Sequence, residues 1–99
     1  MIEGAAFADC VSVNKLIFSD TSLLKKIGDH AFRGCRNLKE VYLPDSVKYV
    51  GISAFRDCVS LEQISVSEKI KNQPGIAELE KNCPNARIRF REVDSVEKE

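Results

Sequence analysis

Four cysteines and a single histidine are the side chains of this sequence best suited to nucleophilic, redox or metal chemistry. Cys10, Cys35 and Cys58 each lie three residues after the Phe of an Ala-Phe pair. If these segments stack, neighbouring cysteines lie about 4.8 Å apart, within the roughly 4.4–6.8 Å between Cα atoms that a disulfide accepts. The spacing favours the alternative, a column of reduced thiols that pack as small hydrophobic side chains. A zinc site is not expected, because the sequence has no CxxC and a linear column cannot form a tetrahedron.

No catalytic arrangement accompanies these thiols. His30 occupies a variable position before an Ala-Phe pair, where we expect a solvated turn residue, and no serine or acid stands at a regular distance to build a triad around it. Glu40, Asp45 and Glu62 are expected on strand or loop surfaces, whereas paired-carboxylate catalysis needs two acids at a fixed distance in a cleft. We therefore predict that the protein is not an enzyme and has no catalytic residues, metal or cofactor.

The composition limits the class of protein. The chain has 99 residues, of which 43% are hydrophobic and 30% charged, and its formal net charge is zero. This length fits one domain, and the neutral charge gives no general attraction to nucleic acid or anionic membrane. No apolar run approaches the roughly 18 residues of a membrane-spanning helix, and the start lacks the basic and apolar regions of a signal peptide. We predict no nucleic-acid partner and no membrane insertion.

The elements that must position these residues follow from an internal repeat. Residues 27–44, IGDHAFRGCRNLKEVYLP, are closely matched by residues 50–67, VGISAFRDCVSLEQISVS, and a related pattern begins at Ile2. Each unit has an apolar residue five positions before the Phe, then Ala-Phe, Cys, and apolar residues at +3, +6 and +8 after the Cys. A fixed period of roughly 20–29 residues with a leucine-rich core is typical of a leucine-rich repeat solenoid. Each unit is too small to fold alone, and stacking joins the units around one continuous core.

Within a unit, the segment LKEVYL predicts a strand with one solvated face. Val41 and Leu43 alternate with Glu40 and Tyr42, and Pro44 cannot donate to a ladder, so it ends the pairing. The Ala-Phe segments are too short for long helices and predict turns, or single turns of helix, that place the Phe under the strand. The predicted fold class is α/β: a right-handed leucine-rich repeat solenoid of about four repeats with short parallel strands and short helices or turns.

The pattern IGDHAFRGCRNLKEVYLPDSVKYV resembles the BspA-type leucine-rich repeat, which is found in bacterial and protozoan surface proteins. The resemblance covers residues 2–66, where Ile or Val, Gly, Ala-Phe, Cys and the Leu/Val triplet recur in order. It implies adhesion to host or matrix proteins, and a cell-surface or secreted location.

The pattern changes after residue 66. Ile76, Leu79 and Cys83 share one helical face, which predicts a longer helix, and Ile88 and Phe90 then alternate with arginines. We interpret this segment as a divergent unit that caps the C-terminal end. The predicted repeats are approximately 2–26, 27–49 and 50–69, with the capping repeat at 70–91. They form one domain, 1–91, followed by a charged tail, 92–99.

The first unit has no polar cap of its own. The strand around Leu16 would therefore expose unpaired backbone groups, which are a template for another chain. Self-association through this N-terminal strand edge is one prediction. A fragment of a longer repeat protein is the other, and we leave both open.

The outward strand positions form the predicted binding surface, because repeat proteins bind through the face that stacking makes broad. The predicted binding residues are two columns, Lys15, Glu40, Gln63 and Arg87, and Ile17, Tyr42, Ser65 and Arg89. A third outward column is Ser19, Pro44, Ser67 and Arg91. Tyr42 beside Ile17 is the best candidate for an apolar anchor, since tyrosine is enriched in interface hot spots. The alternative is that these are ordinary isolated exposed residues.

Three arginines, Arg87, Arg89 and Arg91, share one face of the last strand. They could bind carboxylate or phosphate groups, but the terminal position favours the role of charges that protect a sheet edge from aggregation. We predict a non-catalytic module that binds a protein partner, of unknown identity, through the concave strand face. The alternative is a structural or self-assembling solenoid unit.

Overall fold

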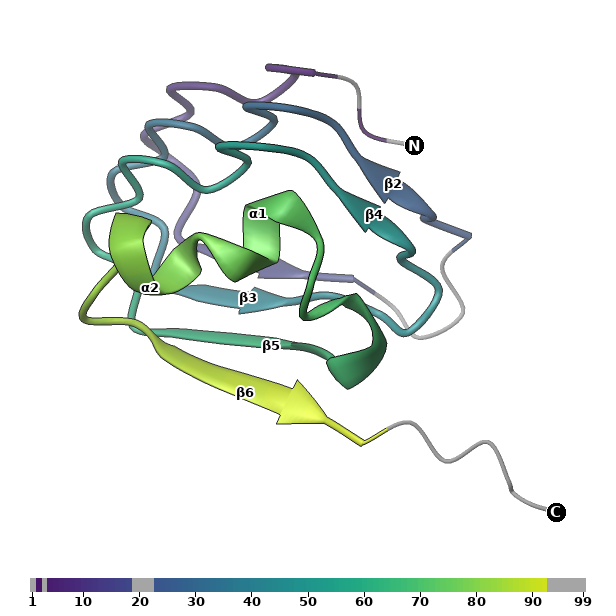
Figure 1. Ribbon diagram of the computed structural model, residues 1–99. Helices are drawn as coiled ribbons and strands as arrows, with labels where there is room; N and C mark the ends of the chain where they lie inside the picture. The colour runs from purple at the N-terminus through teal and green to yellow at the C-terminus, as the bar shows by residue number, and fades with distance from the viewer. Residues whose placement is uncertain (1, 3, 19–22, 93–99) are drawn as a thin grey trace, which may run out of the picture.

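The computed structural model describes residues 2, 4–18 and 23–92. The chain winds through successive layers that place strands on two opposite sides of one core (Figure 1). One side carries β1 (Lys15–Ile17), β3 (Glu40–Tyr42), β5 (Gln63–Ser67) and β6 (Arg87–Arg91). The other side carries β2 (Lys26–Ile27) and β4 (Tyr49–Val50). The prediction of an α/β repeat fold with short parallel strands is confirmed, while the right-handed winding, the number of four repeats and the exact repeat boundaries remain predictions.

The larger sheet has the strand order β1-β3-β5-β6, and every neighbouring pair is parallel. Its register aligns Leu16, Val41, Ile64 and Ile88 in one row, and these side chains belong to the core or pack against it. The alternation predicted from LKEVYL is therefore correct, since Val41 is buried between the half-buried Glu40 and Tyr42.

The smaller sheet was not predicted. β2 and β4 pair in parallel, and Ile2 extends the pairing through an isolated bridge to Ile27. Its core positions, Ile27 and Val50, are the apolar residues that stand five positions before each Phe. As strand residues they are buried, and they form the apolar side of the core opposite the larger sheet.

The Ala-Phe segments form stacked turns rather than helices. His30 and Ser53 adopt left-handed backbone conformations, with φ of 59° and 57°. The turns are joined by their own ladder, in which the backbone N–H of Phe7 donates to Ala31 and that of Phe32 donates to Ala54. Each turn thereby points its Phe side chain into the layer.

The core contains a stack of aromatic rings and a column of thiols. The ring centroids of Phe7 and Phe32 are 5.4 Å apart, and those of Phe32 and Phe55 are 5.6 Å apart, in nearly parallel planes. All four cysteines are free. The thiols of Cys35, Cys58 and Cys83 each donate to the carbonyl of a Phe one layer earlier, as this series shows: Cys35 to Phe7, Cys58 to Phe32 and Cys83 to Phe55.

The C-terminal cap differs from its prediction in one respect. Instead of one longer helix, the chain forms η1 (Glu68–Ile70), α1 (Pro74–Ala77) and α2 (Leu79–Asn82). Glu78 lies between α1 and α2, and its carboxylate accepts the backbone N–H of Ser53 at 2.7 Å and the amide of Asn82 at 2.9 Å. In the layer before, the corresponding backbone N–H of His30 donates to the carbonyl of Ile52. A side chain therefore ends the ladder of turns at this layer.

The N-terminal end is less well covered than the C-terminal end. Phe7 is 43% exposed, whereas Phe32 and Phe55 are 1% exposed. Cys10 and Leu16 are only half-buried, unlike their counterparts in the next two layers. Of the predicted tail 92–99, Glu92 is exposed and 93–99 lie outside the described residues.

Candidate functional site

The structure brings both predicted columns together on the outward face of the larger sheet, here called the strand face. The register places Lys15, Glu40, Gln63 and Arg87 in one row and Ile17, Tyr42, Ser65 and Arg89 in the next. A depression of about 530 Å³ lies on this face, and seven of the eight predicted residues line it: Ile17, Glu40, Tyr42, Gln63, Ser65, Arg87 and Arg89. Lys15 does not line it. The alignment is thus confirmed, while a binding role for these residues remains a prediction.

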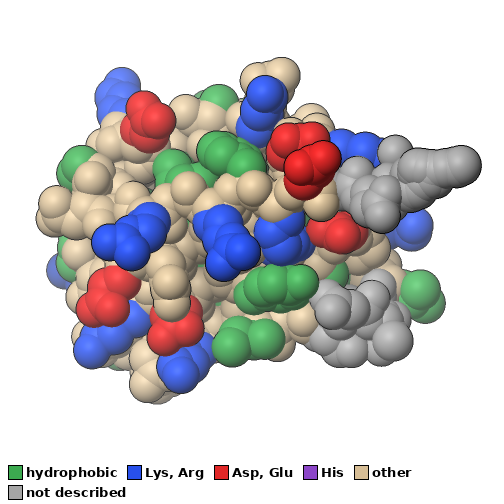
Figure 2. Space-filling model, turned by 90° about the horizontal axis from the view of Figure 1, so that it is seen from below, with side chains coloured by type: hydrophobic (Ala, Val, Ile, Leu, Met, Phe, Trp, Pro, Cys, Tyr) green, Lys and Arg blue, Asp and Glu red, His purple; other side chains and the backbone are tan. Residues whose placement is uncertain are grey.

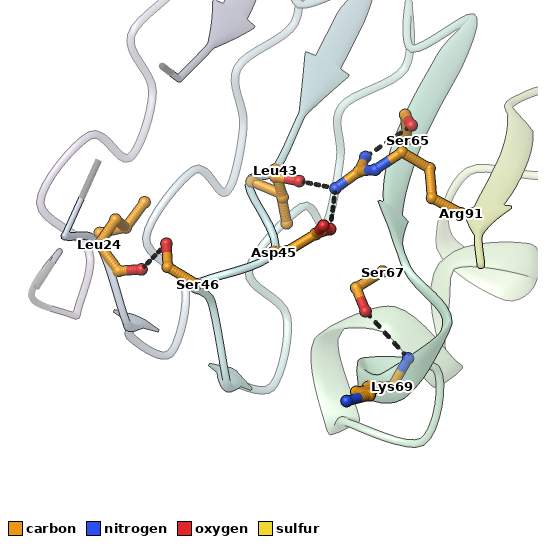
Figure 3. Close-up of polar contacts among 8 residues, drawn as sticks. All are labelled: Leu24, Leu43, Asp45, Ser46, Ser65, Ser67, Lys69 and Arg91. Carbon is orange, nitrogen blue, oxygen red and sulfur yellow. Dashed lines mark hydrogen bonds and ion pairs between the residues drawn. The ribbon is translucent and has the colours of Figure 1, made fainter. Parts of the chain in front are cut away.

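Two of the four positions in the third predicted column are not on the outward surface. Pro44 and Ser67 are buried, and Ser19 lies outside the described residues. Ser67 is buried where it caps η1: its hydroxyl oxygen accepts the backbone N–H of Lys69 at 3.1 Å (Figure 3). A comparable contact tethers the neighbouring loop, where the hydroxyl of Ser46 donates to the carbonyl of Leu24 at 2.6 Å. Among the described members of this column, only Arg91 lines the depression on the strand face.

Arg91 is the site residue that the sequence did not assign to the binding surface. From β6 its guanidinium crosses β5 and donates to the Ser65 hydroxyl at 2.7 Å, to Asp45 at 2.9 Å, and to the carbonyl of Leu43 (Figure 3). The same group lies 4.2 Å from the centroid of the Tyr42 ring. Arg91 is half-buried and forms part of the wall of the depression, while the predicted role of the arginines in protecting the sheet edge remains a prediction.

Because of this contact, Tyr42 is not the freely exposed anchor expected from the sequence. The ring is half-buried, and the cation–π contact with Arg91 stabilises this arrangement by about 0.5–2 kcal/mol. The more open apolar side chain is Ile17, which is 65% exposed and pairs with Tyr42 across β1 and β3. The sequence contained part of the signal for Arg91. Arg91 continues the alternation of Arg87 and Arg89, and an acid that it could pair with, Asp45, follows Pro44.

Some charged side chains of the strand face have an ionic partner among the described residues, and others do not. Lys15 and Glu40 approach to 3.8 Å, with both side chains substantially exposed, so the pair contributes only about 0–1 kcal/mol. Arg91 is paired with Asp45. Arg87 and Arg89 are exposed, and neither forms an ion pair or side-chain hydrogen bond with the residues that the structure describes. Figure 2, seen from below Figure 1, shows basic side chains in a row across the middle of the view with hydrophobic side chains beside part of it.

The thiols and His30 lie in the turns and the core, apart from the depression. Burial raises the pKa of Cys58 to about 12 and that of Cys83 to about 11, so both thiols stay protonated near neutral pH. His30 is half-buried in a turn rather than fully solvated. Within 2, 4–18 and 23–92, no group of three or more His, Cys, Asp or Glu residues could hold a metal ion. The strand face itself presents apolar, polar and charged side chains, and none of the thiols or His30.

Comparison with known proteins identifies the family. Residues 1–86 match the model of the BspA type leucine rich repeat region, which describes six copies of the repeat. The chain belongs to the BspA-type leucine-rich repeat family. No curated protein and no solved structure matches the chain. Leucine-rich repeat domains are generally non-catalytic, and BspA-type repeats are typical of interaction or surface proteins. Among the described residues, no helix is long and apolar enough to cross a membrane.

Proposed function

We propose that this protein is a non-catalytic interaction module that binds a protein partner through the strand face. The observation that carries the proposal is the depression of about 530 Å³, where an exposed Ile17 from β1, the ring of Tyr42 from β3 and three arginines from β6 converge. Protein interfaces combine an apolar centre with a polar rim and are enriched in Tyr and Arg. The family supports a surface location and an adhesive role, because BspA-type repeats are generally surface or secreted proteins.

Binding to a panel of immobilised, purified extracellular-matrix proteins tests this proposal. Ile17→Ser is the preferred variant, because its side chain is 65% exposed and its removal should leave the core intact. Tyr42→Ala is the second, although it also removes the platform of Arg91. Val59→Ser is the matched control, since Val59 is 71% exposed and does not line the depression.

We expect Ile17→Ser to weaken binding at least about tenfold if it is an anchor, a loss of roughly 1.4 kcal/mol. Val59→Ser should bind like the wild type. Circular dichroism and urea unfolding check that each variant is folded. Equal binding by the wild type and both strand-face variants would count against this face.

A second candidate function is self-association through the N-terminal end. It is favoured by the exposure of Phe7 and by β1, which pairs only with β3 in the part of the chain described. An apolar end with an unpaired strand edge is a template for a second copy. Light scattering under reducing conditions distinguishes this candidate, because a stand-alone binding module keeps the mass of a monomer at every concentration.

A further inference from the structure

The strand face has an excess of positive charge that points to the chemistry of its partner. The lining of the depression contains Arg87, Arg89 and Arg91 but only one acid, Glu40. Glu40 is approached by Lys15, and Arg91 by Asp45. Two guanidinium groups thus remain without an ionic partner among the residues that the structure describes. Both lie on β6, two residues apart on the same face, so they are about 6.6 Å apart along the strand.

The opposite side of the same face presents an exposed apolar side chain, Ile17, beside the Lys15–Glu40 pair. Ile17 on β1 stands in the same row as Arg89 on β6, with Tyr42 and Ser65 between them. Three strand spacings separate Ile17 from Arg89, about 14 Å at about 4.8 Å each. An extended chain rises about 3.3 Å per residue, so about four residues of a bound segment would span the row.

We infer that the strand face binds an extended acidic segment of the partner protein, with carboxylates on Arg87 and Arg89 and an apolar side chain on Ile17 and Tyr42. This inference rests on the proposed function and narrows it to one class of partner surface. Guanidinium groups bind carboxylates through paired hydrogen bonds, and arginine is less strongly hydrated than lysine, so it suits an interface.

A nucleic acid fits these residues less well, although phosphates would also bind the arginines. Single-stranded nucleic acids need open aromatic platforms on which bases stack. The depression has one aromatic ring, Tyr42, and the guanidinium of Arg91 already lies 4.2 Å from its centroid. The exposed Ile17 instead suits an aliphatic side chain. We therefore commit to an acidic peptide segment as the occupant.

Selection from a phage-displayed library of random dodecapeptides tests the inference. The immobilised wild-type protein should enrich peptides with an excess of Asp and Glu and an apolar side chain about four residues away. The enriched peptides are then synthesised with a fluorophore and titrated by anisotropy. Binding should weaken as sodium chloride is raised, because salt screens exposed charges.

The matched variants are R87Q/R89Q and R33Q/R56Q. Both remove two positive charges from exposed arginines, but Arg33 and Arg56 lie in the turns and do not line the depression. R87Q/R89Q should lose at least about tenfold in affinity for the selected peptides, the scale of one charge-assisted hydrogen bond. R33Q/R56Q should bind as the wild type does. Equal losses in both variants would overturn the inference, because only net charge would then matter.

The remaining outcomes separate the inference from the proposed function. Selected peptides without acids that still lose affinity in Ile17→Ser would overturn the acidic partner and keep the strand face as a binding site. Peptides unaffected by Ile17→Ser and by R87Q/R89Q, or no enrichment at all, would contradict both. Tighter binding of a fluorescent single-stranded oligonucleotide than of any selected peptide would replace the acidic segment with a nucleic acid.

Discussion

Phe32 is the residue on which the stacked core most directly depends. It is 1% exposed and lies between two parallel rings, at centroid distances of 5.4 Å and 5.6 Å. We expect Phe32→Ala to lower the free energy of unfolding by about 3–5 kcal/mol, since it removes a large buried ring and leaves a cavity. Phe7→Ala should cost clearly less, because that ring has one stacking neighbour and is 43% exposed. Urea unfolding measures both, and equal losses would contradict the stacked-core account.

The buried thiols make stability depend on alkaline pH. Burial raises the pKa of Cys58 to about 12 from its ordinary 9.0, so the folded state keeps the proton while the unfolded chain releases it. The contribution of this thiol to the free energy of unfolding should therefore be constant below about pH 8 and decrease as pH rises through about 9 toward 12. Cys58→Ala should flatten this decrease, and Cys10→Ala is the control because Cys10 is only half-buried. Urea midpoints at several pH values test this, and parallel curves for both variants would contradict it.

At the residue scale, the sequence was sufficient where one side chain repeats a local pattern. The row of Ile17, Tyr42 and Ser65 could be predicted because side chains alternate with a period of two and the units share one register. Arg91 could not be assigned in the same way. Its contacts span 48 residues to Leu43, and a long side chain reaches such a partner only through tertiary packing. The burial of Ser67 was missed because its capping contact depends on where η1 begins.

Among the elements, the C-terminal cap depends on one side chain. The carboxylate of Glu78 accepts the backbone N–H of Ser53, a buried residue that has no following layer of turns to pair with. Glu78→Ala should lower the free energy of unfolding by about 1–3 kcal/mol, the cost of leaving such a donor unsatisfied. Glu80→Ala is the matched control on α2, where an exposed side chain should change stability by no more than about 0.5 kcal/mol. Urea unfolding of both variants is the measurement, and equal effects would show that the cap does not depend on this contact.

Element types were harder to predict than their order. Ile76, Leu79 and Cys83 have helical spacing, yet the chain forms two helices of four residues each. The two helices are separated at Glu78, and α1 packs closely on the preceding layer at Gly75, where a Cβ would lie 2.3 Å from the carbonyl oxygen of Gly51. The close approach holds α1 against the turn of the preceding layer. Such packing distances are tertiary properties that a hydrophobic period does not contain.

At the scale of the whole molecule, the difference between its two ends limits how copies of the chain could assemble. The C-terminal end is covered by η1, α1 and α2, and Glu78 ends the ladder of turns. The N-terminal end exposes Phe7 and one edge of β1. Stacking one end of the solenoid on the other would generate an open filament, but the cap blocks it. Two copies that met through their N-terminal ends would instead form a closed two-fold dimer.

Self-association should therefore stop at the dimer. If the second candidate function holds, light scattering over a concentration series, under reducing conditions, should show a mass that rises from 11.1 kDa toward twice that value and no further. Ala6→Glu should abolish the rise, because Ala6 is exposed at this end whereas its counterpart Ala31 is fully buried between layers. Ala77→Glu, an equal change at an exposed position of the C-terminal cap, should leave it intact. A monomer at all concentrations would rule out self-association through this edge, and species larger than a dimer would show that the C-terminal cap does not close the solenoid.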